Sequence, residues 1–228
     1  MLNKTLLPKL YVVGGSIGYA GYLRAMEGRS VQFELTQNPA HADMALFTGG
    51  EDVNPATYGE GCGSWTHFTN RDKHEVEMFN FFVDSEVPMV GICRGLQLFA
   101  GLNGGRLIQD TTGHAGANHG VVFEGYDDEG MEDRFKGTIC LPYTSAHHQM
   151  VDPTKIKPDW KILGISDGRR SKHYLGGDDK PIHGVDTEIE CVYFPQTQCL
   201  GIQGHPEWMD PNSDSVEFWR QLIKTYLL

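Results

Sequence analysis

VPMVGICRGLQLFAG, residues 87–101, decides the fold of this 228-residue chain. Its apolar beginning, which contains a proline and ends at a glycine, is typical of a short buried strand. Leu96, Leu98 and Phe99 then follow at spacings that suit a helix packed against a sheet. Cys93 therefore lies where a strand turns abruptly into a helix, which is an unusual position for a thiol.

The segments around this stretch alternate between strand and helix patterns. Strands are predicted at 9–13, 31–35, 44–47 and 87–91, and helices at 19–27, 71–85 and after Cys93. The helix over 71–85 is supported by an Arg71–Glu75 pair at i, i+4. This βαβ alternation predicts an α/β fold, a flavodoxin-like three-layer sandwich in which helices cover both faces of a central, mostly parallel sheet.

Between residues 110 and 190 the sequence becomes rich in glycine, aspartate and histidine, with short apolar runs. These runs predict a small antiparallel β region, followed by a hairpin made of IECVYFP and CLGIQGHPEW. The last segment predicts an amphipathic helix capped by Ser213 or Asp214. Because no linker, repeat or low-complexity tract interrupts the chain, residues 1–228 are expected to form a single domain.

Composition argues against several classes of protein. The chain carries 19 Lys and Arg against 30 Asp and Glu, a formal net charge of −11, without a basic cluster that would bind nucleic acid. Five cysteines without a CxxC pair predict neither a disulfide framework nor a zinc ribbon. The N-terminus does not look like a signal peptide and no apolar run is long enough for a membrane span, so a cytoplasmic location is expected.

Residues 91–95 read glycine, isoleucine, cysteine, arginine, glycine, with Cys93 at the position of a nucleophile. A nucleophile elbow of this form holds its central side chain clear of the sheet on a strained turn, and larger residues at the glycine positions would collide. The N–H groups of the following helix favour a thiolate, and that of Arg94 could stabilise an oxyanion. The alternative interpretation is a buried structural cysteine beside a helix-packing glycine.

The segment QGHPEW, residues 203–208, supplies a candidate base. In extended backbone, residues two apart point the same way, so Glu207 could reach the imidazole of His205, and Pro206 stiffens the pair. A glutamate that orients a histidine toward a thiol follows the logic of a catalytic triad. A polar loop is the simpler interpretation of H-P-E alone, but the elbow cysteine and H-P-E together favour the triad.

A third element, TGGEDVNPATYGE at 48–60, places Gly49 and Gly50 directly after a predicted strand. A bare backbone there lets a bound carbonyl approach and suits a second oxyanion donor. An ordinary glycine turn is the commoner meaning of two adjacent glycines.

With these motifs the chain resembles the class I glutamine amidotransferase-like superfamily, and within it the γ-glutamyl-γ-aminobutyrate hydrolase branch. The motifs keep the family's order over residues 48–208: TGGEDVNPATYGE, RDKHE, GICRGLQLFAGLNGGRLIQD, SAHHQ and LGIQGHPEW. The resemblance implies Cys93 as nucleophile, His205 as base and Glu207 as the third member of the triad. It also implies further site residues, which are Gly50 and Arg94 for the oxyanion hole, Gln97 for the γ-glutamyl group, and His147, His148 and Gln149 near the pocket. Gly49, after the same predicted strand as Gly50, is a further candidate for substrate binding.

Two departures from the family pattern concern the leaving group. The family usually has a bulky aromatic residue before H-P-E, where this chain has Gly204, so a wider pocket is expected. The region before Thr48 is short and only weakly similar to the family.

Two rival functions are less favoured by the sequence. A metal hydrolase would use His114, His119, His147 and His148, but their spacing matches no metal motif, so no metal or other cofactor is expected. A binding module that only keeps the fold would be expected to lose Cys93 or His205.

The sequence therefore predicts a cysteine hydrolase that cleaves a γ-glutamyl amide bond through a thioester on Cys93. The alternative is a glutaminase subunit that delivers ammonia to a separate synthetase, because the triad chemistry would be the same. Either function needs a small γ-glutamyl amide or glutamine as substrate, and neither involves a nucleic acid or a membrane. A homodimer is compatible with both.

Overall fold

The computed structural model describes residues 7–14, 19–28, 32–126 and 131–228. Its helices are α1 (Tyr19–Met26), α2 (Arg71–Asp84), α3 (Arg94–Leu102) and α4 (Asp214–Leu227). Its strands are β1 (Lys9–Val13), β2 (Glu34–Thr36), β3 (Met44–Phe47), β4 (Met89–Ile92), β5 (Leu107–Ile108), β6 (Asp110–Thr111), β7 (Ala115–Tyr126), β8 (Gly137–Ala146), β9 (Met150–Val151), β10 (Lys161–Ser166), β11 (Tyr174–Leu175), β12 (Ile189–Phe194) and β13 (Cys199–Ile202).

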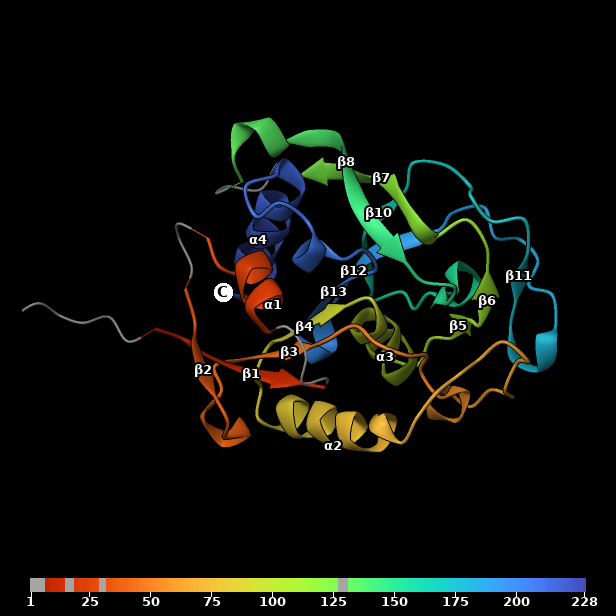
Figure 1. The fold of residues 1–228 in the computed structure, drawn as a ribbon, viewed down its shortest axis with the longest axis horizontal. Coiled ribbons are helices and arrows are strands. Elements are labelled where there is room, and N and C mark those ends of the chain that lie inside the picture. Colours follow the sequence, from red (N-terminus) through yellow and green to blue (C-terminus); the bar gives the residue numbers. More distant parts are fainter. Residues whose placement is uncertain (1–6, 15–18, 29–31, 127–130) are drawn as a thin grey trace, which may run out of the picture.

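A nine-stranded sheet in the order β2-β1-β3-β4-β13-β12-β10-β7-β8 forms the centre of the molecule (Figure 1). The strands from β2 to β13 pair in parallel, and those from β13 to β8 pair antiparallel. The antiparallel strands expected between 110 and 190 thus extend the central sheet. Two small sheets, β6 with β11 and β5 with β9, lie beside it.

The two faces of the sheet carry separate apolar clusters, because side chains alternate along each strand. Met44 and Leu46 of β3 join one cluster with residues of α1 and α4, whereas Phe47 joins the other with residues of α2 and α3. In Figure 1, α1 and α4 lie above the parallel strands and α2 lies below them. The predicted three-layer α/β fold is therefore confirmed.

The element boundaries differ from the sequence predictions mainly at the N-terminal side. The strand predicted at 31–35 is observed as β2 at Glu34–Thr36, and its first position lies outside the described residues. The final helix has Ser213 as its cap, with the hydroxyl accepting a hydrogen bond from the N–H of Val216. Across residues 7–14, 19–28, 32–126 and 131–228, none of the helices combines the length and the apolar character that crossing a bilayer requires.

Candidate active site

Cys93 joins β4 to α3 with a positive φ of 52° and a ψ of −103°. This conformation is strained for a residue that carries a side chain. A Cβ at Gly95 would lie 2.5 Å from the carbonyl oxygen of Phe47, and one at Gly91 would lie 2.6 Å from the carbonyl carbon of Gly95. The two glycines therefore let strand and helix approach closely enough to form the predicted elbow.

His205 and Glu207 follow β13, the parallel neighbour of β4. The imidazole Nδ1 of His205 lies 2.8 Å from Oε1 of Glu207, and both side chains are buried. Pro206–Trp208 form a short 3₁₀ turn, however, and the extended backbone expected between the two residues is absent. The predicted contact is present, but the turn brings the carboxylate to the ring.

The charge state of His205 is set by its two neighbours. Burial disfavours the imidazolium, but the interactions with Cys93 and Glu207 outweigh it and raise the pKa of His205 to about 10. A protonated imidazole beside a thiol favours the thiolate. At neutral pH His205 is therefore protonated and can donate a proton in the cavity.

Two side chains that flank the H-P-E motif complete this arrangement, and the sequence reasoning missed both. The Trp208 ring stacks on that of His205, with centroids 3.7 Å apart and planes 4° from parallel. The amide of Gln203 donates to Sγ of Cys93 at 3.6 Å. Their positions next to H-P-E in the sequence were the available signal.

The loop after β3 packs against the cysteine and the histidine. A Cβ at Gly49 would lie 3.1 Å from Cε1 of His205 and 3.7 Å from Cβ of Cys93. The N–H of Gly49 donates to the hydroxyl of Tyr22 on α1 at 3.2 Å. Tyr22 is a further residue of the site that the sequence did not indicate.

Arg71 of α2 holds the same loop from the opposite side. Its guanidinium donates to Oγ1 of Thr48 at 2.8 Å, to the carbonyl of Thr48 at 3.2 Å and to that of Gly49 at 3.1 Å. A Cβ at Gly50 would lie only 2.2 Å from Nη1 of Arg71, so the arginine can occupy this place only beside a glycine. Tyr22 and Arg71 together fix the backbone of residues 48–50.

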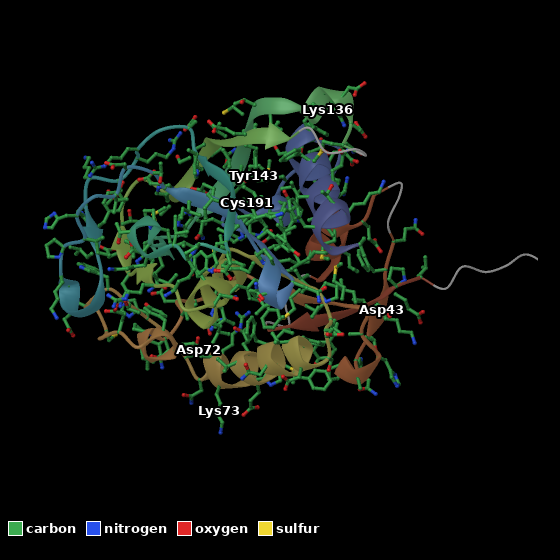
Figure 2. All side chains as sticks on the ribbon, turned by 180° about the vertical axis from the view of Figure 1, so that it is seen from behind. Asp43, Asp72, Lys73, Lys136, Tyr143 and Cys191 are labelled. Atoms are coloured by element: carbon green, nitrogen blue, oxygen red, sulfur yellow. The ribbon has the colours of Figure 1, made fainter. Side chains whose placement is uncertain are left out.

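The Arg94 side chain is buried beneath the site and does not line it. It pairs with Asp72 at 2.8 Å and with Glu75, which also binds Nε of Arg71 at 2.5 Å. Figure 2 shows the consequence for α2, where Lys73 points outward to solvent while Asp72 lies on the inner side. The RDKHE motif thus ties α2 to the first turn of α3.

A cavity of about 600 Å³ opens above the elbow. It is lined by Ala20, Gly21, Tyr22, Arg24, Gly49, Gly50, Cys93, Ala146, His205, Glu207 and Trp208. The structure therefore brings together, around one cavity, five residues that the sequence analysis singled out. Helix α1 supplies four of the other lining residues, including the exposed Arg24, and Ala146 and Trp208 complete the wall.

Four residues associated with the pocket by resemblance do not line this cavity within the described part of the chain. Gln97 is buried on α3, where its amide donates to the carbonyl of Gln149 at 2.8 Å. His147 is also buried, and its Nδ1 lies 2.8 Å from the same carbonyl. Burial and the neighbouring His114 hold the pKa of His147 well below its usual range.

His148 points away from its neighbours toward two carboxylates. Its ring lies 3.0 Å from Asp52 and 3.3 Å from Asp110. The hydrogen bond to Asp52 is the largest influence on the half-buried ring and raises the pKa of His148. His148 therefore connects the loop after β3 to the segment after β5.

Gly204 does not widen the cavity, contrary to the expectation from the sequence. A Cβ at Gly204 would lie 2.8 Å from Cβ of Tyr143, whose hydroxyl donates to the carbonyl of Ser215 at 2.6 Å. Tyr143 lies in the interior near Cys191 (Figure 2). The space that an aromatic residue would take at position 204 is thus filled by Tyr143.

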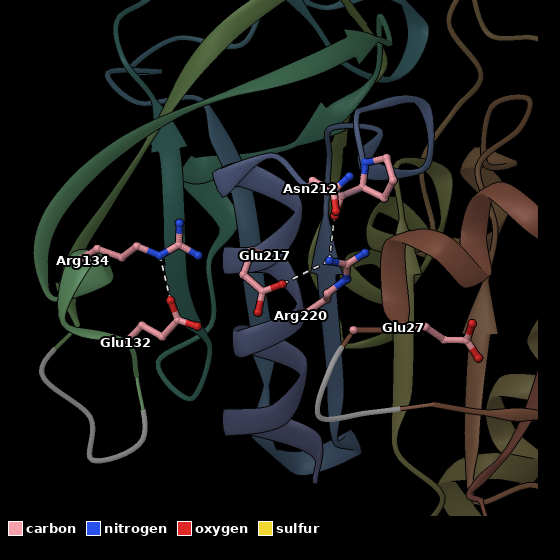
Figure 3. A pocket seen from close by; sticks show the side chains of 8 residues that line it. Glu27, Glu132, Arg134, Asn212, Glu217 and Arg220 are labelled. Atoms are coloured by element: carbon pink, nitrogen blue, oxygen red, sulfur yellow. Dashed lines mark hydrogen bonds and ion pairs between the residues drawn. The ribbon is translucent and has the colours of Figure 1, made fainter.

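A second depression of about 550 Å³ lies beside α4 (Figure 3). Its arginines are already paired, Arg220 with Glu217 at 3.1 Å and Arg134 with Glu132 at 2.7 Å. None of the described residues that line it is a nucleophile, so the cavity at Cys93 remains the candidate active site.

The chain matches the Peptidase C26 family over residues 32–168, more than half of its length. The chain belongs to the Peptidase C26 family. This Peptidase C26 protein is 40% identical over 188 residues to the glutamine amidotransferase-like protein YvdE of Lactococcus lactis subsp. lactis (strain IL1403), a match that covers 77% of this chain and 71% of YvdE. The protein therefore belongs to the class I glutamine amidotransferase-like superfamily and is an amidohydrolase.

The protein is also similar, at lower sequence identity, to a synthase subunit and to a solved structure. The carbamoyl phosphate synthase small chain of Buchnera aphidicola subsp. Baizongia pistaciae (strain Bp) is 25% identical over 151 residues, which are 66% of the C26 chain and 31% of that protein. The structure of PurLQS from Thermotoga maritima superimposes with a TM-score of 0.63 at 15% identity, covering 98% of this chain and all of that one. The latter similarity is one of fold.

Proposed function

We propose that this protein is a cysteine hydrolase that cleaves the γ-glutamyl amide bond of a small molecule. The observation that carries this proposal is the strained Cys93 at the floor of a cavity that also contains the hydrogen-bonded pair of His205 and Glu207. In this assignment Cys93 is the nucleophile, His205 the general acid and base, and Glu207 the residue that fixes the tautomer and orientation of the imidazole.

The first half of the proposed reaction forms a thioester. The Cys93 thiolate attacks the γ-carbonyl carbon, a C–S bond forms, and the carbonyl π electrons move to oxygen. Backbone N–H groups of Gly50 and Arg94 are the donors proposed for this oxyanion. When the intermediate collapses, the C–N bond breaks and the His205 imidazolium gives its proton to the departing amine.

The second half releases glutamate. Neutral His205 takes a proton from water, the resulting hydroxide attacks the thioester carbonyl, and the C–S bond breaks to regenerate the thiolate. The raised pKa of His205 supports the first proton transfer, because the imidazole enters the cycle protonated. The chemistry uses only groups of the chain and water.

Residues at the mouth of the cavity support a leaving amine larger than ammonia. Arg24 lies exposed on the wall formed by α1, and among the described residues no carboxylate forms an ion pair with it. A guanidinium in this position suits a leaving group that carries its own carboxylate. Trp208, which is 59% exposed, offers an aromatic face at the same rim.

The alternative of an ammonia-donating subunit has one supporting observation, the similarity to a protein named as the small chain of a synthase. Steady-state glutamate release by the purified protein alone decides between the two. We expect faster hydrolysis of a γ-glutamyl amide whose leaving amine bears a carboxylate than of glutamine, and a loss of this preference in Arg24→Met. Negligible rates on every γ-glutamyl amide, restored only by an added synthetase, would establish the ammonia donor instead.

A further inference from the structure

A second cluster of reactive side chains lies within the sheet, apart from the triad. The donor atoms of His114, His119 and Glu190 lie within 4.8 Å of one another, and all three residues are buried. Nε2 of His119 is 2.9 Å from Oε1 of Glu190, and Nδ1 of His114 is 3.5 Å from the same oxygen.

The topology of the sheet explains how these residues meet. Strand β10 separates β12 from β7 but pairs with β7 only through Gly164–Ser166, opposite Val121–Phe123. The part of β7 before Val121, together with His114 just ahead of the strand, extends beyond the paired part of β10, so its side chains can reach β12. Spacing in the sequence could not show this, because Glu190 follows His119 by 71 residues.

The hydrogen bonds of this cluster are incomplete. Nδ1 of His114, Nδ1 of His119 and Oε2 of Glu190 have no hydrogen-bond partner among the residues that the structure describes. Nε2 of His114, in contrast, lies 3.1 Å from Oε2 of Glu188. Buried polar atoms without partners are costly, and a carboxylate that lacks compensation is more costly still.

We propose that His114, His119 and Glu190 bind a divalent transition-metal ion such as Zn²⁺. Imidazole nitrogen and carboxylate oxygen are, with cysteine thiolate, the usual zinc ligands of proteins, and nitrogen and oxygen donors on a zinc tetrahedron lie roughly 3.3 Å apart. The two measured separations bracket that value. Ca²⁺ and Mg²⁺ prefer all-oxygen sites, so two imidazoles select against them.

Glu188 has the position of a carboxylate that supports a metal ligand. It approaches the ring nitrogen of His114 that faces away from Glu190, as outer carboxylates do at histidine–zinc sites. Its own oxygens also accept from the Tyr174 hydroxyl at 2.7 Å and from the N–H of Ser171 at 2.9 Å. Glu188 is thus held in place independently of any metal.

The proposed site is structural, and Gln203 connects it to the nucleophile. The carbonyl of Glu190 accepts the N–H of Gln203 at 2.7 Å, and the Gln203 side chain contacts Cys93. Because the three ligands are at most 4% exposed, no substrate reaches the ion. The ion would clamp β7 to β12 and takes no part in the thioester chemistry, so the proposal does not depend on the proposed function.

Metal analysis of the purified full-length chain tests the site. Chelator-treated protein supplied with Zn²⁺ and freed of excess is expected to retain about one zinc per chain, and its Tm should rise by about 5 °C or more. Added Co²⁺ should give stronger visible absorption than the same Co²⁺ in buffer without protein. A wild-type protein that retains no zinc, with a Tm unchanged by zinc, would overturn the proposal.

Variants of the proposed ligands test whether these side chains bind the zinc. Glu190→Gln and His119→Gln should lose the zinc, whereas the exposed His74→Gln and the active-site variant Cys93→Ala should keep it. Zinc lost in Cys93→Ala would place the ion at the active site and refute the assignment. Zinc retained in folded Glu190→Gln and His119→Gln would refute it as well. If either ligand variant fails to fold, the wild-type titrations still decide.

Discussion

Cys93 differs from the other four cysteines in backbone and surroundings. Cys191 and Cys199 lie in the core, where burial raises the pKa of each thiol far above its usual range, and Cys62 and Cys140 are exposed outside the cavity. We therefore expect a glutamine-mimicking electrophile to label Cys93 alone, as read by peptide mass, and Cys93→Ala to abolish hydrolysis. Labelling at another cysteine, or a Cys93→Ala variant that turns over, would show that the nucleophile lies elsewhere.

Glu207 can be tested through the pH dependence of the reaction. Below a pKa of about 10, His205 is protonated and can supply the leaving amine with its proton, so kcat should fall as the pH rises through that value. Glu207→Gln removes one of the groups that raise the pKa, so the alkaline limb should move to lower pH. The rate should fall by up to ~10⁴, and His205→Ala should be at least as damaging. An alkaline limb unchanged in Glu207→Gln would mean that the carboxylate does not act on His205.

At the level of single residues, the sequence predicted the elbow at Cys93 and the contact of His205 with Glu207, both of which are present, and one geometry that is wrong. Cys93, His205 and Glu207 could be proposed as a triad because the elbow and the H-P-E motif are local patterns. The turn at Pro206–Trp208 was not foreseen, because the alternation rule applies only to extended backbone. Trp208 stacking on His205 was missed because an exposed aromatic residue after a motif has many ordinary explanations.

Between elements, the contact of α2 with the loop after β3 positions one of the two proposed oxyanion donors, the N–H of Gly50. Arg71 makes three hydrogen bonds to Thr48 and Gly49, and its removal would free the backbone at Gly50. Arg71→Met is therefore expected to lower kcat by roughly 10- to 100-fold with little change in KM. Lys73→Met on the outer side of α2 is the matched control and should match the wild type.

A positioning role for Arg71 requires more than a lower rate. Arg71→Lys keeps the charge and should recover part of kcat, because one ammonium can replace some but not all of the three hydrogen bonds. If Arg71→Met lost activity only in proportion to a loss of folded protein, the residue would have a purely structural role. A rise in KM of Arg71→Met by the same factor as its fall in kcat would also contradict a positioning role.

Most helices and strands could be predicted from local patterns, but the pairing of the strands in the sheet could not. The alternation of strands and helices up to residue 102 follows from apolar periodicity. The sequence predicted antiparallel strands in a small β region, but it did not indicate that β7, β8 and β10 extend the central sheet. Pairing of strands distant in sequence depends on tertiary packing, which no local window contains.

For the molecule as a whole, Gly204 shows how a family comparison of single positions can mislead. Gly204→Ala would place a methyl group against Tyr143, so we expect a loss of stability of about 1–3 kcal/mol, seen as a lower Tm. The ratio of kcat/KM for a γ-glutamyl amide to that for glutamine should stay constant, because the residue faces the core. If Gly204→Ala changed this ratio and left the Tm unchanged, Gly204 would instead have to line the cavity.

The most direct test of the proposed chemistry is to trap the covalent intermediate on the whole protein. The enzyme is mixed with a γ-glutamyl amide, quenched in acid within the first turnovers, and digested for peptide mass analysis. We predict a γ-glutamyl group on the peptide that contains Cys93, removable by hydroxylamine as a thioester, and absent from Cys93→Ser. Steady turnover of the substrate without any adduct on Cys93 at any quench time, while Cys93→Ser remains active, would contradict the assignment of this residue as the nucleophile.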